Sequence, residues 1–187
     1  MSIYNRIQEL WKNPKENLGE IYRQRVIGWR KDPSVLKLEY PTRLDRARNL
    51  GYKAKRGFVM VRVKLPSGGR MRPQPDGGRR TRRSGRRKVL AMSYQWVAEQ
   101  RAQKHFVNLE VLNSYEVAYD AHHYWFEVIM VDPEMPEIKS DPNINWICGQ
   151  RNRVYRGLTS AGKKSRGLRY KGKGSEKARP SKRVHRM

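Results

Sequence analysis

The feature that most constrains this chain is the uneven placement of its charge. Residues 70–88 contain nine basic side chains and one acid, and residues 151–187 contain fourteen basic side chains and one acid. Between residues 107 and 147 the balance reverses, with eight acids against one lysine. Because long runs of like charge repel one another and do not build a core, the sequence predicts two basic segments that flank an acid-rich folded part.

The total charge indicates a polyanionic partner. The chain carries 42 lysine and arginine residues against 17 acids, a net charge of +25. Such a chain repels itself unless a polyanion neutralises it, and nucleic acid is a more common partner than an anionic membrane surface. The 26 arginines outnumber the 16 lysines. Since guanidinium groups pair with phosphates and stack on bases, this balance favours structured RNA.

Other protein classes are disfavoured. No apolar run approaches the roughly 20 residues that a membrane-spanning helix needs. The single cysteine, Cys148, excludes an internal disulfide framework and a zinc site built from several cysteines, and it suggests a reducing compartment. We therefore expect a cytoplasmic protein without a membrane partner.

Two amphipathic helices are predicted near the N-terminus. Ser2 is expected to cap the first, and Pro14 lies in the first turn of the second. Thr42 and Asp45 then have the spacing of a capping box before a short helix that ends near Gly51. The predicted apolar stripe of the second helix consists of Leu18, Ile21, Tyr22, Val26 and Trp29.

The central part predicts an α+β core. Strands are expected over 35–40 and 57–65, a helix over 93–105, and a hairpin whose strands, 109–119 and 124–131, flank residues 120–123. Too few apolar residues follow Ile147 to build a core there. These patterns leave the strand order open. They divide the chain into N-terminal helices packing on the core (1–33), an α+β core (34–147) with a basic loop (66–91), and an extended basic RNA-binding tail (148–187).

One segment resembles a nucleotide-binding loop. Residues 157–164 have the glycine and lysine spacing of a phosphate-binding loop, but Lys164 stands where a magnesium-binding Ser or Thr is required. The segment also lacks the buried strand that should precede it. Its glycines can still bring backbone amides close to phosphates, as RNA binding would need.

No catalytic or metal site is predicted from the remaining polar residues. His122 and His123 are adjacent, so on a strand they point to opposite faces and do not share a metal. The hairpin glutamates Glu110, Glu116 and Glu127 are expected to keep the strand surface soluble or to pair with arginines. We therefore expect no enzyme activity, no cofactor, no metal and no small-molecule substrate.

The predicted RNA-binding residues are basic side chains of three segments. They are Arg43, Arg46, Arg48, Lys53, Lys55 and Arg56 in the first; Arg70, Arg72, Arg79, Arg80, Arg82, Arg83, Arg86, Arg87 and Lys88 in the basic loop; and Arg151, Arg153, Arg156, Lys163, Lys164, Arg166, Arg169, Lys171, Lys173, Lys177, Arg179, Lys182 and Arg183 in the basic tail.

Several blocks of the sequence resemble a known family over essentially the whole chain. They include IQELWK at 7–12, PTRLDRAR at 41–48, VAEQRA at 97–102 and, most specifically, RGLTSAGKKSRGL at 156–168. The chain is similar to ribosomal proteins of the fifteen-e family, components of the large subunit in archaea and eukaryotes. Its ending, GKGSEKARPS at 172–181, resembles the archaeal branch.

The resemblance implies a structural constituent of the archaeal 50S subunit that binds 23S rRNA. It also implies a small, mainly antiparallel four-stranded sheet packed with helices, and neighbouring large-subunit proteins, among them the kink-turn-binding one. The residues alone leave open a second function, that of a freestanding RNA- or DNA-binding chaperone or a chromatin-type protein.

Overall fold

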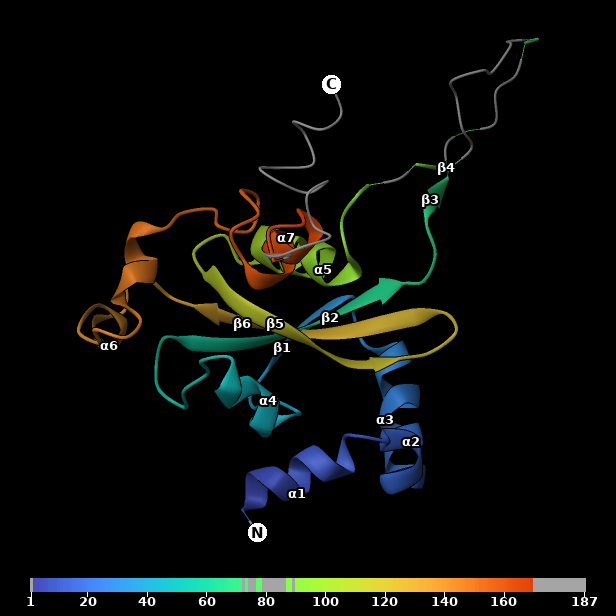
Figure 1. Ribbon diagram of the computed structural model, residues 1–187, viewed down its shortest axis with the longest axis horizontal. Helices are drawn as coiled ribbons and strands as arrows, with labels where there is room; N and C mark the ends of the chain where they lie inside the picture. Colours follow the sequence, from blue (N-terminus) through green and yellow to red (C-terminus); the bar gives the residue numbers. More distant parts are fainter. Residues whose placement is uncertain (1, 72, 74–76, 79–86, 89, 170–187) are drawn as a thin grey trace.

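The computed structural model describes residues 2–71, 73, 77–78, 87–88 and 90–169. Its centre is a four-stranded antiparallel sheet in which the strand order is β1-β2-β6-β5. Figure 1 shows helices on both faces of this sheet. The strands are β1 (Val35–Leu38), β2 (Phe58–Pro66), β5 (Glu110–Tyr119) and β6 (His123–Val131). The α+β class and the mainly antiparallel four-stranded sheet are therefore confirmed.

Alternation along β2 and β6 creates one core on each face of the sheet. In β2, Val61, Val63 and Leu65 face one helical layer, whereas Met60 faces the other. In β6 every residue from 125 to 131 is buried, because this strand pairs with a neighbour on each side and is covered on both faces. A central strand that is buried on both faces has a continuous run of apolar residues. This run made the hairpin of β5 and β6 recognisable in the sequence.

The helix α5 (Tyr94–His105) forms the main element of one layer. The Ser93 side chain caps it by accepting a hydrogen bond from the Trp96 amide at 3.3 Å. Ala98 and Ala102 are fully buried against the sheet. Small side chains at these positions let the helix approach the strands closely, which agrees with the predicted helix over 93–105.

The opposite layer contains the N-terminal helices α1 (Ile3–Leu10), α2 (Pro14–Asn17) and α3 (Gly19–Lys31), together with α4 (Leu44–Asn49). The single helix predicted from Pro14 is divided at Gly19, whose φ is +48°. Tyr22, Val26 and Trp29 of α3 are buried, but Ile21 is 58% exposed. Ile21 was wrongly placed in the buried stripe, because it lies about 100° around the helix from Tyr22.

The predicted capping box before α4 is wrong. The Thr42 amide and hydroxyl both donate to the carboxylate of Glu127, which lies on β6. Tyr115 on β5 donates its hydroxyl to the same carboxylate. Glu127 is completely buried and Glu110 nearly so, hence only Glu116 keeps the strand surface soluble as predicted. The spacing of Thr42 and Asp45 was misleading because the Thr42 hydroxyl donates to Glu127, which is distant in the sequence.

The part of the chain after β6 folds back onto the core. It contains α6 (Pro136–Lys139), the 3-10 helix η1 (Asn145–Gly149) and α7 (Ser160–Ser165). Val154 and Ala161 are buried in the same cluster as α5. The prediction that no core forms after Ile147 is therefore wrong for this stretch, since a few small side chains suffice to fill the space beside α5. The remainder of the basic tail, 170–187, lies outside the described residues.

The two buried glutamates give a prediction for the pH dependence of stability. Burial raises the pKa of Glu99 on α5 and of Glu127 above the ordinary value of 4.5, although hydrogen bonds to their carboxylates oppose the shift. The folded state therefore binds more protons than the unfolded state above pH 4.5. This contribution to stability is complete below pH 4.5 and is lost as the pH rises through the folded-state pKa values.

We expect the free energy of unfolding to fall as the pH is raised from about 4.5 toward neutrality. The double variant Glu99→Gln and Glu127→Gln should show a flatter profile over that range. Urea titrations at a series of pH values would measure both. An equally steep profile in the double variant would assign the pH dependence to other groups.

Candidate nucleic-acid interface

Both ends of the basic loop are held against the core. At its start the Ser67 amide donates to the His122 carbonyl at 2.6 Å. The Gly68 amide donates to the Tyr94 hydroxyl at 2.8 Å, and that hydroxyl donates back to the Gly68 carbonyl at 2.9 Å. At the other end the Ser93 amide donates to the Ser165 hydroxyl at 3.2 Å. The loop therefore leaves the core from a defined base between β2 and α5.

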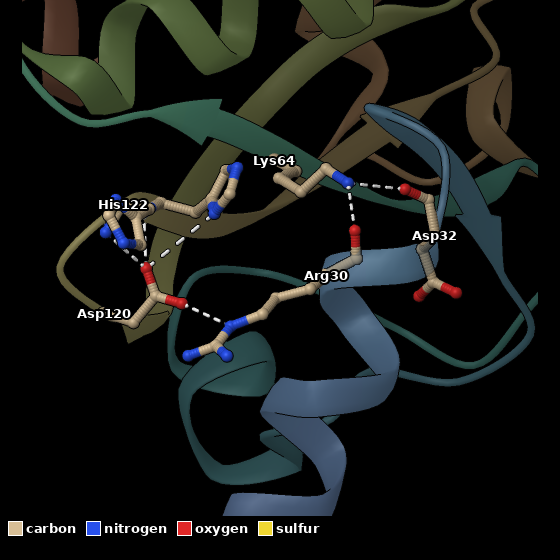
Figure 2. A network of polar contacts seen from close by, with 6 residues as sticks. Arg30, Asp32, Lys64, Asp120 and His122 are labelled. Carbon is tan, nitrogen blue, oxygen red and sulfur yellow. Dashed lines mark hydrogen bonds and ion pairs between the residues drawn. The ribbon is translucent and has the colours of Figure 1, made fainter.

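Charged residues at the end of α3 strengthen this base (Figure 2). Arg30 Nε lies 2.8 Å from Asp120 Oδ2, and the backbone amide of His122 donates to the same carboxylate at 2.8 Å. Lys64 Nζ on β2 donates to the carbonyls of Arg30 and Asp32, each at 2.7 Å. Burial works against ionisation of Asp120, but the donors around it hold its pKa below the ordinary value. This network joins α3, β2 and the hairpin turn, where His122 serves as a turn residue.

Within the basic loop, two short strands pair with each other. β3 (Arg70–Met71) and β4 (Arg87–Lys88) are antiparallel, and Arg70 is opposite Lys88. Figure 1 shows this ribbon beyond the end of β2, away from the central sheet. The sequence did not predict it, because the loop has no apolar alternation. The other predicted RNA-binding residues of the loop lie outside the described residues: Arg72, Arg79, Arg80, Arg82, Arg83 and Arg86.

The described part of the basic tail is attached to the core by a buried carboxylate that the sequence analysis missed. Glu99 on α5 is fully buried and accepts hydrogen bonds from Ser114 and Thr159, each at 2.5 Å. Thr159 also caps α7, because its hydroxyl accepts a hydrogen bond from the Gly162 amide. Trp96 Nε1 donates to the Val154 carbonyl at 2.8 Å. These bonds connect α5 and β5 to the tail.

The glycines of the segment that resembles a phosphate-binding loop have a packing role. Gly157 has a φ of +66°, and a Cβ atom there would lie 2.8 Å from the Arg166 side chain. A Cβ atom on Gly162 would lie 2.8 Å from the Gly157 Cα. The two glycines therefore allow α7 to turn back tightly beside α5, where a nucleotide-binding loop would need open space. This supports the rejection of a nucleotide site.

Most predicted RNA-binding residues in the described part have exposed side chains. Those of the first segment lie in α4 or close to it in the sequence, and those of the tail lie in α7 or before and after it. The exposed ones are Arg46, Arg48, Lys53, Arg56, Arg151, Arg156, Lys163, Lys164, Arg166 and Arg169. The tail residues Lys171, Lys173, Lys177, Arg179, Lys182 and Arg183 lie outside the described residues.

Three predicted RNA-binding side chains are at least partly buried and contact the protein itself. Arg153 is buried and donates to the Val111 carbonyl at 2.5 Å. Arg43 pairs with Asp45 at 3.1 Å, and its guanidinium lies 5.2 Å from the centre of the Trp11 ring. Lys55 is half-buried and pairs with Asp141 at 2.8 Å. Burial of Arg153 and the bonds from its Nη1 to backbone carbonyls indicate a structural role, whereas the sequence analysis assigned this residue to RNA.

Asp141 pairs with two of the predicted residues at once. Lys53 Nζ and Lys55 Nζ each lie 2.8 Å from Asp141 Oδ2. Hydrogen bonds from these lysines hold the pKa of Asp141 well below the ordinary value. Lys53 remains half exposed, so it can contact an anion while it is paired.

The sequence analysis also overlooked exposed basic residues outside the three segments. Arg23 and Arg25 on α3, and Arg101 and Lys104 on α5, have exposed side chains. Their helical spacing beside the buried stripe could have identified them, since residues opposite the stripe face solvent. Among the described residues, no group of three or more His, Cys, Asp or Glu side chains is placed to hold a metal ion. None of the described helices is long and apolar enough to cross a membrane.

A small α+β core with a basic loop and a basic tail defines a class of protein, namely one whose core positions cationic segments for a polyanion. A family model described as Ribosomal L15 matches residues 2–185. The chain therefore belongs to the Ribosomal L15e family, which consists of structural proteins of the large ribosomal subunit and not of enzymes. It is a component of the ribonucleoprotein that carries out translation, and its location is the cytoplasmic ribosome.

Proposed function

We propose that this protein binds and stabilises folded 23S rRNA in the archaeal 50S subunit. The basic loop (66–91) and the basic tail (148–187) make the principal contacts, and the exposed cations around α4 add to them. The N-terminal helices (1–33) and the core (34–147) form the support that positions these segments. Arg153 is excluded from this set, and Arg43 and Lys55 contribute mainly through their internal pairs.

One observation carries the proposal: the described part of the tail places all its basic side chains except Arg153 on the surface, and no acid occurs in this part of the sequence. No Asp or Glu occurs between residues 142 and 169, and Arg151, Arg156, Lys163, Lys164, Arg166 and Arg169 are all exposed. A protein surface without a polyanionic partner usually intersperses both signs of charge. If ten basic residues in all contacted phosphates, the slope of log affinity against log salt would be roughly −7 to −9.

The acid-rich part of the chain suggests protein neighbours. Between residues 107 and 147, Glu116 and Glu134 have exposed side chains. We propose that other large-subunit proteins contact the molecule on surfaces of this kind, and that the kink-turn-binding protein is one of them.

Sedimentation of native lysate through sucrose gradients at moderate and high salt tests the proposal. The protein is expected to remain with the large-subunit peak at about one copy per particle, because many phosphate contacts act together. Ultraviolet crosslinking of the peak fraction should join the protein to 23S rRNA. Recovery of most of the protein at the top of the gradient would instead indicate a freestanding RNA or DNA chaperone.

A further inference from the structure

Trp146 is an exposed aromatic residue in the acid-free stretch 142–169, two residues before the basic tail begins. It lies on η1, and 46% of the residue is accessible to solvent. The Arg153 guanidinium lies over its ring, 4.7 Å from the ring centre. An indole in this position is large and apolar, so exposing it is unfavourable unless a partner covers it.

The guanidinium that supports the ring is itself held in place. Arg153 Nη1 donates to the carbonyls of Val111 and Leu112, at 2.5 and 3.2 Å. Only 8% of Arg153 is exposed. Because β5 fixes the guanidinium, the indole ring has one face supported before any partner arrives, which lowers the entropy lost when a second flat group stacks on the tryptophan.

Two further arginines, Arg151 and Arg156, lie in the turn of the chain that follows η1. Arg156 donates to the Gln150 side chain at 3.0 Å and to the Arg151 carbonyl at 2.9 Å, so these residues share one compact turn after η1. Both arginines are exposed. The one acid paired with Arg151 is Glu134, at 3.8 Å and with 78% of its side chain exposed, which is a weak ion pair. Exposed cations in the same segment as an aromatic ring are the combination that binds single-stranded nucleic acid.

We propose that Trp146 stacks on an unpaired base of the RNA, while Arg151 and Arg156 contact the adjacent phosphates. This inference rests on the proposed function and refines it. It adds a contact to an RNA base, whereas the proposed function names only contacts between basic side chains and phosphates. Because Arg151 and Arg156 are exposed and Glu134 is only weakly paired, this surrounding favours a nucleotide over a protein side chain as the group that covers the ring.

Another exposed aromatic residue lacks these features. Tyr119 lies beside a cavity of about 690 Å³ between α3 and the hairpin turn. Its ring already stacks on Tyr124, with centres 5.9 Å apart, and Lys15 lies 5.7 Å from the centre of the Tyr119 ring. Glu20 and Asp120 also line that cavity, so it offers a phosphate group no uniformly positive surface.

The test compares two RNA probes that differ only in their bases. The first is a fluorescent single-stranded oligoadenylate of roughly ten nucleotides, and the second is an abasic strand with the same number of phosphates. Full-length protein and the Trp146→Leu and Trp146→Phe variants are titrated with each probe at several salt concentrations, and fluorescence anisotropy reports binding. Thermal melting of each variant checks that it is folded.

Trp146→Leu is expected to bind the oligoadenylate roughly tenfold more weakly, with an unchanged salt slope and unchanged affinity for the abasic strand. Trp146→Phe should remain within about threefold of the wild type, because a smaller aromatic ring still stacks. Equal weakening toward both probes, or no weakening toward either, would overturn the inference. Wild-type protein that binds neither probe nor 23S rRNA would overturn the proposed function instead.

A second measurement needs no substitution. Wild-type protein is crosslinked to an oligonucleotide that contains photoreactive thiouridine, digested with trypsin and analysed by mass spectrometry. The adduct is expected on the peptide 140–151, which contains Trp146. Adducts confined to other peptides would contradict the stacking contact.

Sedimentation of the Trp146→Leu variant distinguishes a protein partner from an RNA base. A variant that binds RNA normally but no longer sediments with the subunit would contradict the inference, because the Trp146 ring would then contact a protein.

Discussion

Replacing Glu99 by alanine should lower the free energy of unfolding by about 3–5 kcal/mol, the largest effect that we expect from any single polar substitution. The carboxylate is fully buried and accepts hydrogen bonds from Ser114 and Thr159. Its loss leaves two buried hydroxyl groups without an acceptor and opens a cavity.

Urea denaturation and thermal melting would measure this loss. A chain of this length should show a fall in Tm of roughly 10 °C. Glu99→Gln keeps the shape and one acceptor, so its effect should be smaller. Glu9→Ala on α1 serves as the control, because Glu9 is exposed and its removal should change stability by less than about 0.5 kcal/mol.

The substitution should also act locally on the tail. Thr159 connects the tail to Glu99. Compared with the wild type, the variant should therefore show faster amide hydrogen exchange in α7, and the increase there should be larger than in β6. Equal protection of α7 in the variant and the wild type would show that packing of Val154 and Ala161 suffices to hold the tail.

The second large effect is expected on RNA affinity. Changing Arg151, Lys163, Lys164 and Arg169 to glutamine should weaken binding to 23S rRNA on the order of a thousandfold at about 0.1 M salt, if each contacts one phosphate. The slope of log affinity against log salt should become shallower by about 3. All four side chains are exposed, so the fold should not change.

A matched variant separates position from overall charge. Arg6, Lys12, Lys31 and Lys37 are also exposed, and changing them to glutamine removes the same number of positive charges, four, from the net charge of +25. These residues lie outside the basic loop and the basic tail, so this variant should keep most of its affinity and its salt slope. Equal losses in the two variants would mean that the net charge, and not the placement of the tail, determines binding.

Most elements of the core were predictable because their signals are local. The alternation along β2 and the apolar run of β6 each depend on residues that are close together in the sequence. The break before α3 was not predicted, because the apolar spacing continues across Leu18 while the backbone at Gly19 turns to a positive φ. The β3–β4 ribbon was missed because its strands contain two residues each.

The candidate interface was predictable as a set of segments but not as a set of free side chains. Arg153 and Arg151 look alike in the sequence, two residues apart, yet one is buried and the other exposed. The difference depends on the Val111 carbonyl, 42 residues away along the chain. Trp146 was likewise not singled out in the sequence, since a single tryptophan carries no periodic signal.

By itself the sequence determined the segregation of charge, the α+β class and the family resemblance, because each depends on composition or on short motifs. The tertiary structure decided the strand order, and it decided which polar residues are buried and which partners they bond to. Glu127 meets Thr42 across 85 positions, and Glu99 meets Thr159 across 60. These partners matter for stability because a buried polar group without a hydrogen-bond partner lowers the free energy of unfolding. No local sequence pattern shows which distant residue will be that partner.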